Sequence, residues 1–259
     1  MKFYLGTDMP GWLWKRDVPL FVSARRLEPY KTLHPATCDW ALDSGGFTEL
    51  SKYGEWRTPP HKYIARVRRY ADELGRLDFA APQDWMCEPF MLEKTGLSVA
   101  DHQRLTIDNY LTLRTLWPDG PVIPALQGWE HDDYLRHVEQ YAAAGVDLPD
   151  LPLVGLGSVC RREATGPAEH LVHVLAGLGI TCHGFGMKTT GLARYGALLG
   201  SADSMAWSMA ARRSRIRLDG HTHQTCSHCP EFALMWRHKV LHPTRSSLWG
   251  ITMVGPGTA

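Results

Sequence analysis

The chain reads PLVGLG at residues 152–157, ITCHGFG at 180–186 and SADSMA at 201–206, three short runs separated by segments with a helical pattern at 163–178 and 189–199. Most of these runs are nearly continuously apolar, as expected for strands that are buried on both faces of a sheet. Strands that alternate with helices predict a parallel sheet, because each helix carries the chain back to the edge where the next strand begins.

The same alternation extends toward the N-terminus. Five further runs are predicted to be strands, and they lie at 2–6, 18–22, 38–43, 77–81 and 121–126. Further helical patterns lie at 60–75, 98–117 and 131–145. Eight strands with intervening helices favour an α/β fold of the closed (β/α)8 TIM-barrel type. An open doubly wound sheet is the alternative, because the connections of the first two strands are short and contain Pro and Trp.

The last part of the chain differs in composition from the rest. Residues 212–217 (RRSRIR) are basic, residues 219–229 are rich in His and Cys, and residues 231–242 have the pattern of a closing helix. We therefore expect a catalytic barrel over residues 1–210 and a C-terminal basic, metal-binding and helical segment over 211–259 that packs on the barrel.

The composition is that of an ordinary globular protein, with 44% hydrophobic residues and 28 Lys+Arg against 27 Asp+Glu. This balance excludes disordered, collagen-like and coiled-coil chains. A net charge of +1 gives no global attraction to nucleic acid, so such binding requires a local patch. No apolar run approaches the roughly 18 residues that span a bilayer, and Gly, Asp and Pro interrupt the N-terminus before any signal-peptide core. We therefore expect a cytoplasmic protein, in the host cytoplasm if a phage encodes it, with no membrane partner.

Polar and glycine-rich segments follow most of the predicted strands. Examples are Asp43-Ser44-Gly45-Gly46-Phe47, the segment ending at Asp84, Gln127-Gly128, and Asp203-Ser204. In a barrel these strand ends meet on one face, where active sites form. A single Asp at a strand end is usually a cap or turn residue, and a Gly pair can be only a tight turn. We therefore predict one shared pocket because polar or glycine-rich residues end several successive strands.

Two carboxylates at one pocket are suited to glycosyl transfer. One carboxylate can attack the anomeric carbon of a sugar while the other moves protons. Glycines beside the carboxylates let backbone N–H groups approach a flat ligand, and Phe47 and His183 offer ring faces for stacking.

An ordered set of motifs resembles the tRNA-guanine transglycosylase superfamily. The set is DSGGF at 43–47, APQD ending at 84, PALQG at 124–128, GLG at 155–157, HGFGMK at 183–188 and SAD at 201–203. Within that superfamily the sequence is most similar to the DpdA branch, the 7-deazaguanine DNA transglycosylases of phages and bacterial genome islands. The resemblance covers residues 40–240 and implies a TIM barrel that exchanges guanine in DNA for a 7-deazaguanine such as 7-cyano-7-deazaguanine.

The resemblance also implies roles for individual residues. Asp203 matches the nucleophile that forms a glycosyl-enzyme intermediate, and Asp43 matches the general acid and base. Asp84 matches the residue that recognises the guanine-like amine, and Gln127 matches a reader of the carbonyl edge. The full substrate-binding set that we expect comprises Asp84, Gln127, Ser44, Gly45, Gly46, Phe47, Gly155, Gly157, His183 and Met187.

A pair of cysteines predicts a metal site. Cys226 and Cys229 form a Cys-x2-Cys pair, and His221 and His223 are the nearest residues that complete four ligands. The family pattern has a further Cys where this chain has Gln224, so the ligand set departs from the family. Four protein ligands predict a structural Zn²⁺ with no open position. A reduced Cys pair beside exposed histidines is the alternative.

Basic residues that follow the later strands are candidates for DNA contact. We expect phosphates to be held by Lys188, Arg161, Arg162, Arg194, Arg212 and Arg213. The expected partners are therefore DNA, a free 7-deazaguanine base and other DNA-modification proteins. The alternatives are the same exchange on tRNA, a non-catalytic nucleic-acid-binding subunit, and a metal-dependent barrel hydrolase that uses His221 and His223.

Overall fold

The computed structural model describes residues 1–159 and 166–242. The chain forms two compact units, Met1–Ala206 and Trp207–Ala259. Of the second unit, the structure describes the residues up to 242. Each unit is described by itself below.

The first unit contains one parallel sheet of eight strands in the order β4-β3-β2-β1-β8-β7-β6-β5. The strands are β1 (Lys2–Thr7), β2 (Leu20–Ser23), β3 (Trp40–Asp43), β4 (Leu77–Ala80), β5 (Ala125–Leu126), β6 (Val154–Leu156), β7 (Cys182–Gly184) and β8 (Ser201–Ser204). This order follows the chain around a ring, because β1 pairs with both β2 and β8.

The ring continues at the two ends of this order, between β4 and the segment before β5. Ala80 forms a parallel bridge with Val122. Its N–H donates to the Pro121 carbonyl at 2.8 Å, and its own carbonyl accepts from Ile123 at 3.2 Å. The predicted α/β TIM-barrel fold is therefore confirmed, and the open doubly wound sheet is excluded because its strand order does not follow the chain around a ring.

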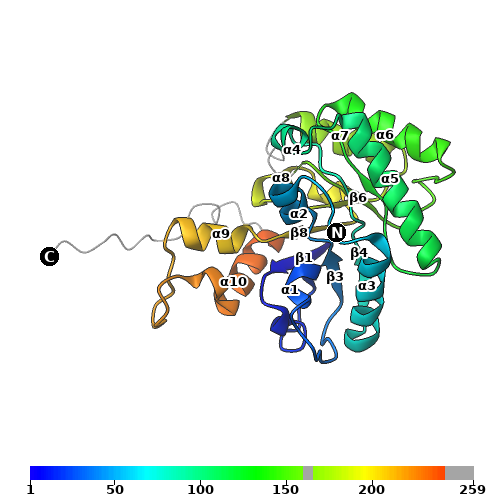
Figure 1. Ribbon diagram of the computed structural model, residues 1–259. Coiled ribbons are helices and arrows are strands. Elements are labelled where there is room, and N and C mark those ends of the chain that lie inside the picture. Colours follow the sequence, from blue (N-terminus) through cyan, green and yellow to red (C-terminus); the bar gives the residue numbers. More distant parts are fainter. Residues whose placement is uncertain (160–165, 243–259) are drawn as a thin grey trace. The chain divides into compact units, whose positions relative to one another are not determined.

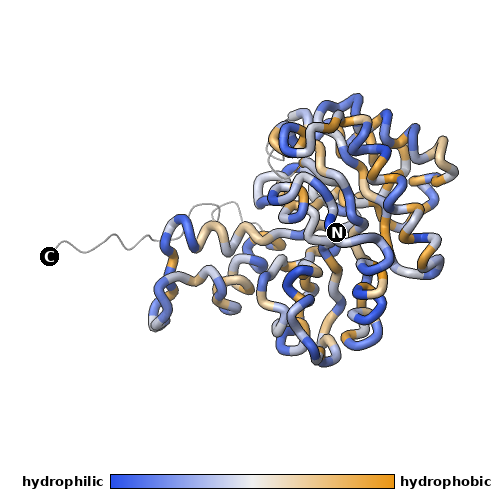
Figure 2. The backbone as a smooth tube through the Cα atoms, in the orientation of Figure 1, coloured by the Kyte–Doolittle hydropathy of each residue, from blue (hydrophilic) through white to orange (hydrophobic). Residues whose placement is uncertain are grey.

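Helices lie on the outside of this sheet (Figure 1). The first unit contains α1 (Ala24–Leu27), α2 (Gly46–Tyr53), α3 (Pro60–Leu74), α4 (Pro89–Thr95), α5 (Val99–Leu116), α6 (His131–Ala143), α7 (Gly166–Gly177) and α8 (Thr189–Tyr195). Along the outer helices, hydrophilic and hydrophobic residues alternate over each turn, as amphipathic helices on a barrel require (Figure 2). Ser98 and Asp101 form a capping box that fixes the start of α5.

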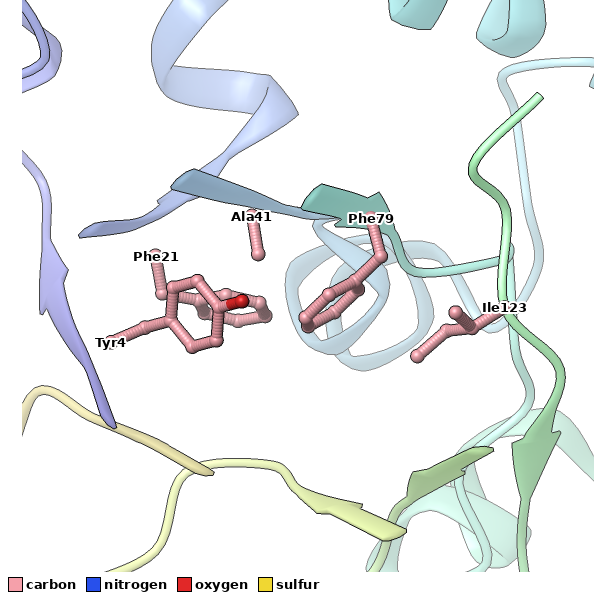
Figure 3. Packing of buried hydrophobic residues seen from close by; sticks show 5 residues of the cluster. All are labelled: Tyr4, Phe21, Ala41, Phe79 and Ile123. Carbon is pink, nitrogen blue, oxygen red and sulfur yellow. The ribbon is translucent and has the colours of Figure 1, made fainter. Parts of the chain in front are cut away.

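Side chains fill the inside of the barrel. Tyr4, Phe21, Ala41 and Phe79 extend from β1 to β4, and Ile123 extends from the segment before β5 (Figure 3). All five are buried, with at most 9% of their surface exposed. This apolar layer closes the centre of the barrel, so polar chemistry is confined to the ends of the strands.

Most predicted elements occur, but several boundaries differ. The run 121–126 contributes only Ala125–Leu126 as strand, because two of its first four residues are Pro121 and Pro124 and a proline cannot donate to a ladder. The short helices α1, α2 and α4 were not expected from the sequence. Each is eight residues or fewer, which is too short to show a helical period.

The second unit contains α9 (Ala206–Arg213), apart from its first residue, and α10 (Pro230–Leu241). Hydrogen bonds to its backbone hold the loop between them. The Cys226 N–H donates to the Ile216 carbonyl at 2.7 Å, and the Ser208 hydroxyl donates to the Ser227 carbonyl at 2.7 Å. Over residues 1–159 and 166–242, none of the helices combines the length and apolar character that a bilayer crossing demands.

Candidate active site

A cavity of about 290 Å³ lies at the carboxyl ends of the strands in the first unit. Residues predicted from the sequence line it from β3, from the segments after β4, β5 and β6, and from β8. They are Asp43, Gly46, Phe47, Asp84, Gln127, Gly157 and Asp203. The cavity therefore brings together three carboxylates and one carboxamide that are far apart in the chain.

A second cavity, of about 440 Å³, lies at the amino ends of the strands and includes Lys2, Tyr4 and Asp78. Its charged groups are bonded to one another, because Lys2 pairs with Asp78 at 2.6 Å and the Tyr4 hydroxyl donates to the same carboxylate at 2.6 Å. In a TIM barrel the amino-terminal face serves stability, so we assign the chemistry to the first cavity.

Asp43 is held by the two elements that flank it. Strands β2 and β3 pair Ser23 with Asp43, and the Ser23 hydroxyl donates a hydrogen bond to the carboxylate. The Gly45 N–H donates a second one. Gly45 has φ +85°, and a Cβ there would lie 2.7 Å from the Arg25 side chain, so glycine is needed for this turn. Burial is the largest influence on Asp43 and raises the pKa of its carboxyl.

Asp203 is buried on β8, with 5% of its surface exposed. The Gly186 N–H donates to its Oδ1 at 2.8 Å, and the His183 Nε2 lies 3.3 Å from the same oxygen. No described residue bonds to the Oδ2 of Asp203. One carboxylate oxygen is thus anchored while the other is available to a ligand.

The three carboxylates influence one another. The charge of Asp203 adds to the rise in the pKa of Asp43, and the charge of Asp43 adds to that of Asp84. Burial first and Asp43 second raise the pKa of Asp84 from an ordinary 3.8 to about 7. A site that must hold several buried carboxylates at close range favours keeping protons on some of them at neutral pH. Such a site can both donate and accept a proton.

Asp84 begins a connected polar network. The Gln127 Nε2 donates to Asp84, and the Gln127 Oε1 accepts from the Ser158 hydroxyl at 2.7 Å. The Ser158 Oγ also lies 3.1 Å from the Glu88 carboxylate and accepts from the Cys87 N–H at 2.8 Å. All of these side chains are buried. A Cβ on Gly157 would overlap the Gln127 amide, so glycine at this strand end is what admits the amide.

Helix α5 fixes the segment that carries Asp84. The His102 Nδ1 donates to the Met86 carbonyl at 2.7 Å, and the Thr106 hydroxyl accepts from the Trp85 N–H at 2.9 Å. The Gln103 amide donates to the Gln127 carbonyl at 2.8 Å. One helix therefore holds the backbone on both sides of the Asp84–Gln127 pair, which keeps the pair in register without ligand.

Some predicted substrate-binding residues lie elsewhere. His183 is fully buried among aromatic rings inside the barrel, so its placement does not offer a ring face to the cavity. Met187 is buried against Gly184. Gly155 makes room for the Phe185 ring. Gly46 and Phe47 line the cavity, whereas Ser44 and Gly45 are buried and are not part of its lining. For His183 the reason is depth, because alternation along a strand gives the side that a residue faces but not how deep in the barrel it lies.

The cavity also contains residues that the sequence did not single out. Phe185 lies two positions beyond His183 and takes the place at the cavity that was expected for His183. Glu88 and Ser158 add the polar network described above. Ser158 follows a strand end that was noticed for its glycines, and its φ of +56° is uncommon for a residue other than glycine. Glu88 lies in an irregular segment, where no periodic pattern could identify it.

The predicted DNA-contacting residues have different surroundings. Lys188 is exposed at the start of α8, and Arg194 is exposed but pairs with Glu169 at 3.0 Å. Arg212 and Arg213 are exposed at the end of α9 in the second unit. Arg161 and Arg162 lie outside the described residues.

The four predicted metal ligands form a cluster in the second unit. The ligand atoms of His221, His223, Cys226 and Cys229 all lie within 4.8 Å of one another. The His223 Nε2 is 3.1 Å from the Cys226 Sγ, and the His221 Nδ1 is 3.6 Å from the Cys229 Sγ. Tetrahedral coordination at zinc bond lengths separates ligand atoms by roughly 3.3–3.8 Å, so the cluster fits such an ion.

One further residue supports this cluster. The Glu231 carboxylate lies 3.0 Å from the His221 Nε2, on the ring nitrogen that faces away from the cysteines. A carboxylate on the outer nitrogen of a ligating histidine orients the ring and fixes its tautomer. The cluster can therefore hold a metal ion, and the four protein ligands leave no position for a substrate.

Comparison with protein-family models matches residues 1–254 to the family described as DpdA, DeoxyPurine in DNA protein A. Comparison with the curated proteins finds no match.

Proposed function

Because the chain belongs to the DpdA family, DeoxyPurine in DNA protein A, we propose that it exchanges guanine in DNA for a 7-deazaguanine base. Membership of this family supports a role in the 7-deazaguanine modification of DNA by a transglycosylase-type enzyme. The observation that carries the proposal is that Asp43, Asp84, Gln127 and Asp203 line one cavity. At about 290 Å³ the cavity is close to the lower limit of ligand pockets, which suits one nucleobase.

In the first half of the proposed reaction, the Oδ2 of Asp203 attacks C1′ of the target nucleotide. The C1′–N9 bond breaks and its electron pair passes to the departing guanine, which takes a proton from Asp43. A raised pKa keeps a proton on this carboxyl to higher pH than usual, which suits a general acid. The product is a glycosyl ester between Asp203 and DNA.

In the second half, the incoming base gives its N9 proton to the Asp43 carboxylate. The N9 nitrogen attacks C1′, the C1′–Oδ2 bond breaks, and the electron pair returns to Asp203. Asp43 ends with the proton that it lent to guanine, so the cycle is balanced. Carbon at position 7 cannot be protonated as the nitrogen of guanine can, which makes the new base a poorer leaving group and the exchange one-way without ATP.

Asp84 and Gln127 are proposed to read the edge of the base. The carboxylate of Asp84 accepts from the exocyclic amine and the ring N–H, and the Gln127 amide, now bonded to Asp84, donates to the carbonyl. Donors on the ligand stabilise the charged form of Asp84 and so lower the pKa of its carboxyl from about 7. Phe47, which is 49% exposed at the cavity, supplies a face for stacking.

DNA would have to present its guanine outside the helical stack, either flipped or in a single strand. Exposed Lys188 and the arginines at 212 and 213 are proposed phosphate contacts. The same base exchange on tRNA is the nearest alternative. A subunit that binds DNA but catalyses no exchange is the second.

The test is incubation of the purified chain with duplex DNA, single-stranded DNA and tRNA in parallel, each with labelled 7-cyano-7-deazaguanine. We expect label in DNA, and we expect nucleoside mass spectrometry to show deazaguanosine in its deoxy form. Label in tRNA alone contradicts the DNA assignment. DNA binding with no incorporation into any nucleic acid supports the non-catalytic subunit.

We propose that the ion held by His221, His223, Cys226 and Cys229 is Zn²⁺ and that its role is structural. The closed set of two imidazoles and two thiols is one that zinc prefers. When bound, the ion would tie the loop before α10 to the start of that helix. Because four protein ligands leave no open position, no step of the reaction uses the metal.

Removal of the metal is therefore expected to unfold the second unit. A chelator should release about one zinc per chain and lower the melting temperature, with activity lost in step with the fold. Cys226→Ser should give the same metal loss by elemental analysis. Cys38→Ser, at a thiol outside the cluster, is the matched control and should keep its zinc. Lost turnover in a chain that stays fully folded would instead favour a metal-dependent hydrolase.

A further inference from the structure

His183 is a buried histidine with no role in the reaction proposed above. Its side chain is 0% exposed. The rings of Phe79 and Phe185 each lie 4.8 Å from its own ring, and Phe21 lies at 5.4 Å. A histidine in such apolar surroundings requires partners for both ring nitrogens, because an unpaired buried polar atom destabilises the fold.

The two nitrogens face two residues of the neighbouring strand. The His183 Nδ1 lies 2.8 Å from the Ser201 hydroxyl, and the Nε2 lies 3.3 Å from the Oδ1 of Asp203. The register explains this, because β7 and β8 pair His183 with Ser201, and Asp203 comes two residues later on the same face of β8. Strand pairing alone therefore places the imidazole between a hydroxyl and the proposed nucleophile.

The two contacts differ in quality. The Nδ1 contact is a hydrogen bond, whereas the Nε2 has no aligned hydrogen-bond partner despite its 3.3 Å approach to Asp203. The Ser201 hydroxyl can donate to Nδ1, which then leaves the ring proton on Nε2, directed to the side of Asp203. A small rotation of either side chain would align this proton with the carboxylate.

The contacts of Asp203 show the consequence. Both the Gly186 N–H and the His183 Nε2 approach Oδ1, and no described residue bonds to Oδ2. The hydrogen bond from Gly186 holds Oδ1, which leaves Oδ2 as the oxygen available to the sugar. A fixed nucleophile reacts faster than one that samples several orientations.

We propose that His183 is a positioning residue for Asp203, holding Oδ1 so that Oδ2 attacks and stabilising the charge that returns to the carboxylate when the glycosyl ester breaks. This inference rests on the proposed function. When the C1′–Oδ2 bond breaks, its electron pair returns to the carboxylate, and the Nε2–H of the imidazole stabilises the charge shared with Oδ1. His183 neither gains nor loses a proton, and it does not touch the base.

The test compares His183→Phe, which keeps the ring but has no N–H, with His183→Gln, which keeps a donor. We expect His183→Phe to lower kcat for base exchange by about 100-fold, the lower end of the effect of one preorganised donor. The KM for the incoming base should stay near the wild-type value, since Asp84 and Gln127 are unchanged. The covalent protein–DNA adduct should decay more slowly during the reaction, as measured on denaturing gels of samples taken over time. His183→Gln should recover most of kcat.

Phe79→Leu is the matched control, because Phe79 packs on the same ring but has no polar group that could bond to Asp203. It should lower the melting temperature while kcat stays near wild type. Equal losses of kcat in His183→Phe and Phe79→Leu, with no recovery in His183→Gln, would show a packing role and overturn the inference. Wild-type kcat in His183→Phe would overturn it as well.

Should His183→Phe fail to fold, Ser201→Ala is the second variant. It leaves the ring in place but removes the partner that keeps the proton on Nε2. A drop in kcat at unchanged KM supports the inference, and wild-type kinetics contradict it. A wild-type chain that forms no adduct and exchanges no base contradicts the proposed function itself, and this inference with it.

Discussion

Asp203→Ala is expected to abolish base exchange, lowering kcat by about 10⁴-fold or more, as loss of a nucleophile does elsewhere. Without the carboxylate no glycosyl ester forms. The C1′–N9 bond then cannot be broken through a covalent intermediate. The fold should survive, because the polar partners of the carboxylate among the described residues are the Gly186 N–H and the His183 ring. Asp203→Asn should still bind DNA, which separates binding from chemistry.

The measurement has two parts. Labelled 7-deazaguanine in DNA reports the whole cycle, and a protein–DNA adduct that survives denaturation reports the first half alone. Asp78→Asn is the matched control, because Asp78 is also a strand aspartate but bonds to Lys2 and Tyr4 at the other end of the barrel. Undiminished incorporation by Asp203→Ala would end the proposed mechanism.

The sequence predicts the fold and much of the cavity because both follow from where strands end. Asp43 and Asp203 are 160 residues apart, yet both end strands of one ring, and ring closure brings strand ends to a common face. The same reasoning places Asp84 and Gln127. Gly157 was expected through the family resemblance, and the structure adds the reason that a side chain there would overlap the Gln127 amide.

The depth of a side chain in the barrel and the course of irregular segments could not be predicted in this way. His183 and Phe185 are two residues apart and so are expected on the same side of the chain, but His183 is fully buried in the barrel, whereas Phe185 packs against the same core and also reaches the cavity. Glu88 lies on a segment whose course is set by hydrogen bonds to α5 at Trp85 and Met86. Those bonds are tertiary and leave no local pattern.

The metal cluster shows the opposite case. All four ligands lie within nine residues, so local spacing alone restricts them to one site. Glu231, which supports His221, was not predicted, because its position depends on where α10 begins and which way its first turn faces.

Asp84→Asn is expected to stabilise the protein at pH 8 while removing its function. Burial and Asp43 hold the pKa of Asp84 at about 7 in the fold, whereas an unfolded chain has the ordinary value of 3.8. Ionising this carboxyl inside the fold is therefore unfavourable by up to about 4 kcal/mol, at 1.36 kcal/mol per pKa unit. An amide has no charge to bury, so the variant escapes this penalty.

The direction in which folding shifts the pKa of Asp84 determines how stability depends on pH. Between about pH 4 and pH 7 the folded protein binds more protons at Asp84 than the unfolded chain does, so this carboxyl stabilises the fold below pH 4 and loses its contribution as the pH rises through 7. Asparagine does not titrate. The difference in unfolding free energy between variant and wild type should thus be small at pH 4, grow across this window and level off above pH 7.

Denaturant titrations from pH 4 to pH 8 measure this difference. Asp39→Asn is a control with the opposite expected effect on stability. A hydrogen bond from Lys2 lowers the pKa of Asp39, so the charged carboxylate stabilises the fold at pH values above the ordinary pKa of an aspartate. That variant should be the less stable one at neutral pH. A constant gap between Asp84→Asn and wild type at all pH values would show that Asp84 is not the titrating group.

The same substitution should raise the KM for the incoming base, because an amide cannot accept from both the amine and the ring N–H as a carboxylate does. A residue that destabilises the folded chain but is needed for binding is characteristic of a functional site, where selection retains a group that packing alone would remove. If Asp84→Asn gains stability at pH 8 and keeps a wild-type KM, the buried carboxylate destabilises the fold but does not recognise the base.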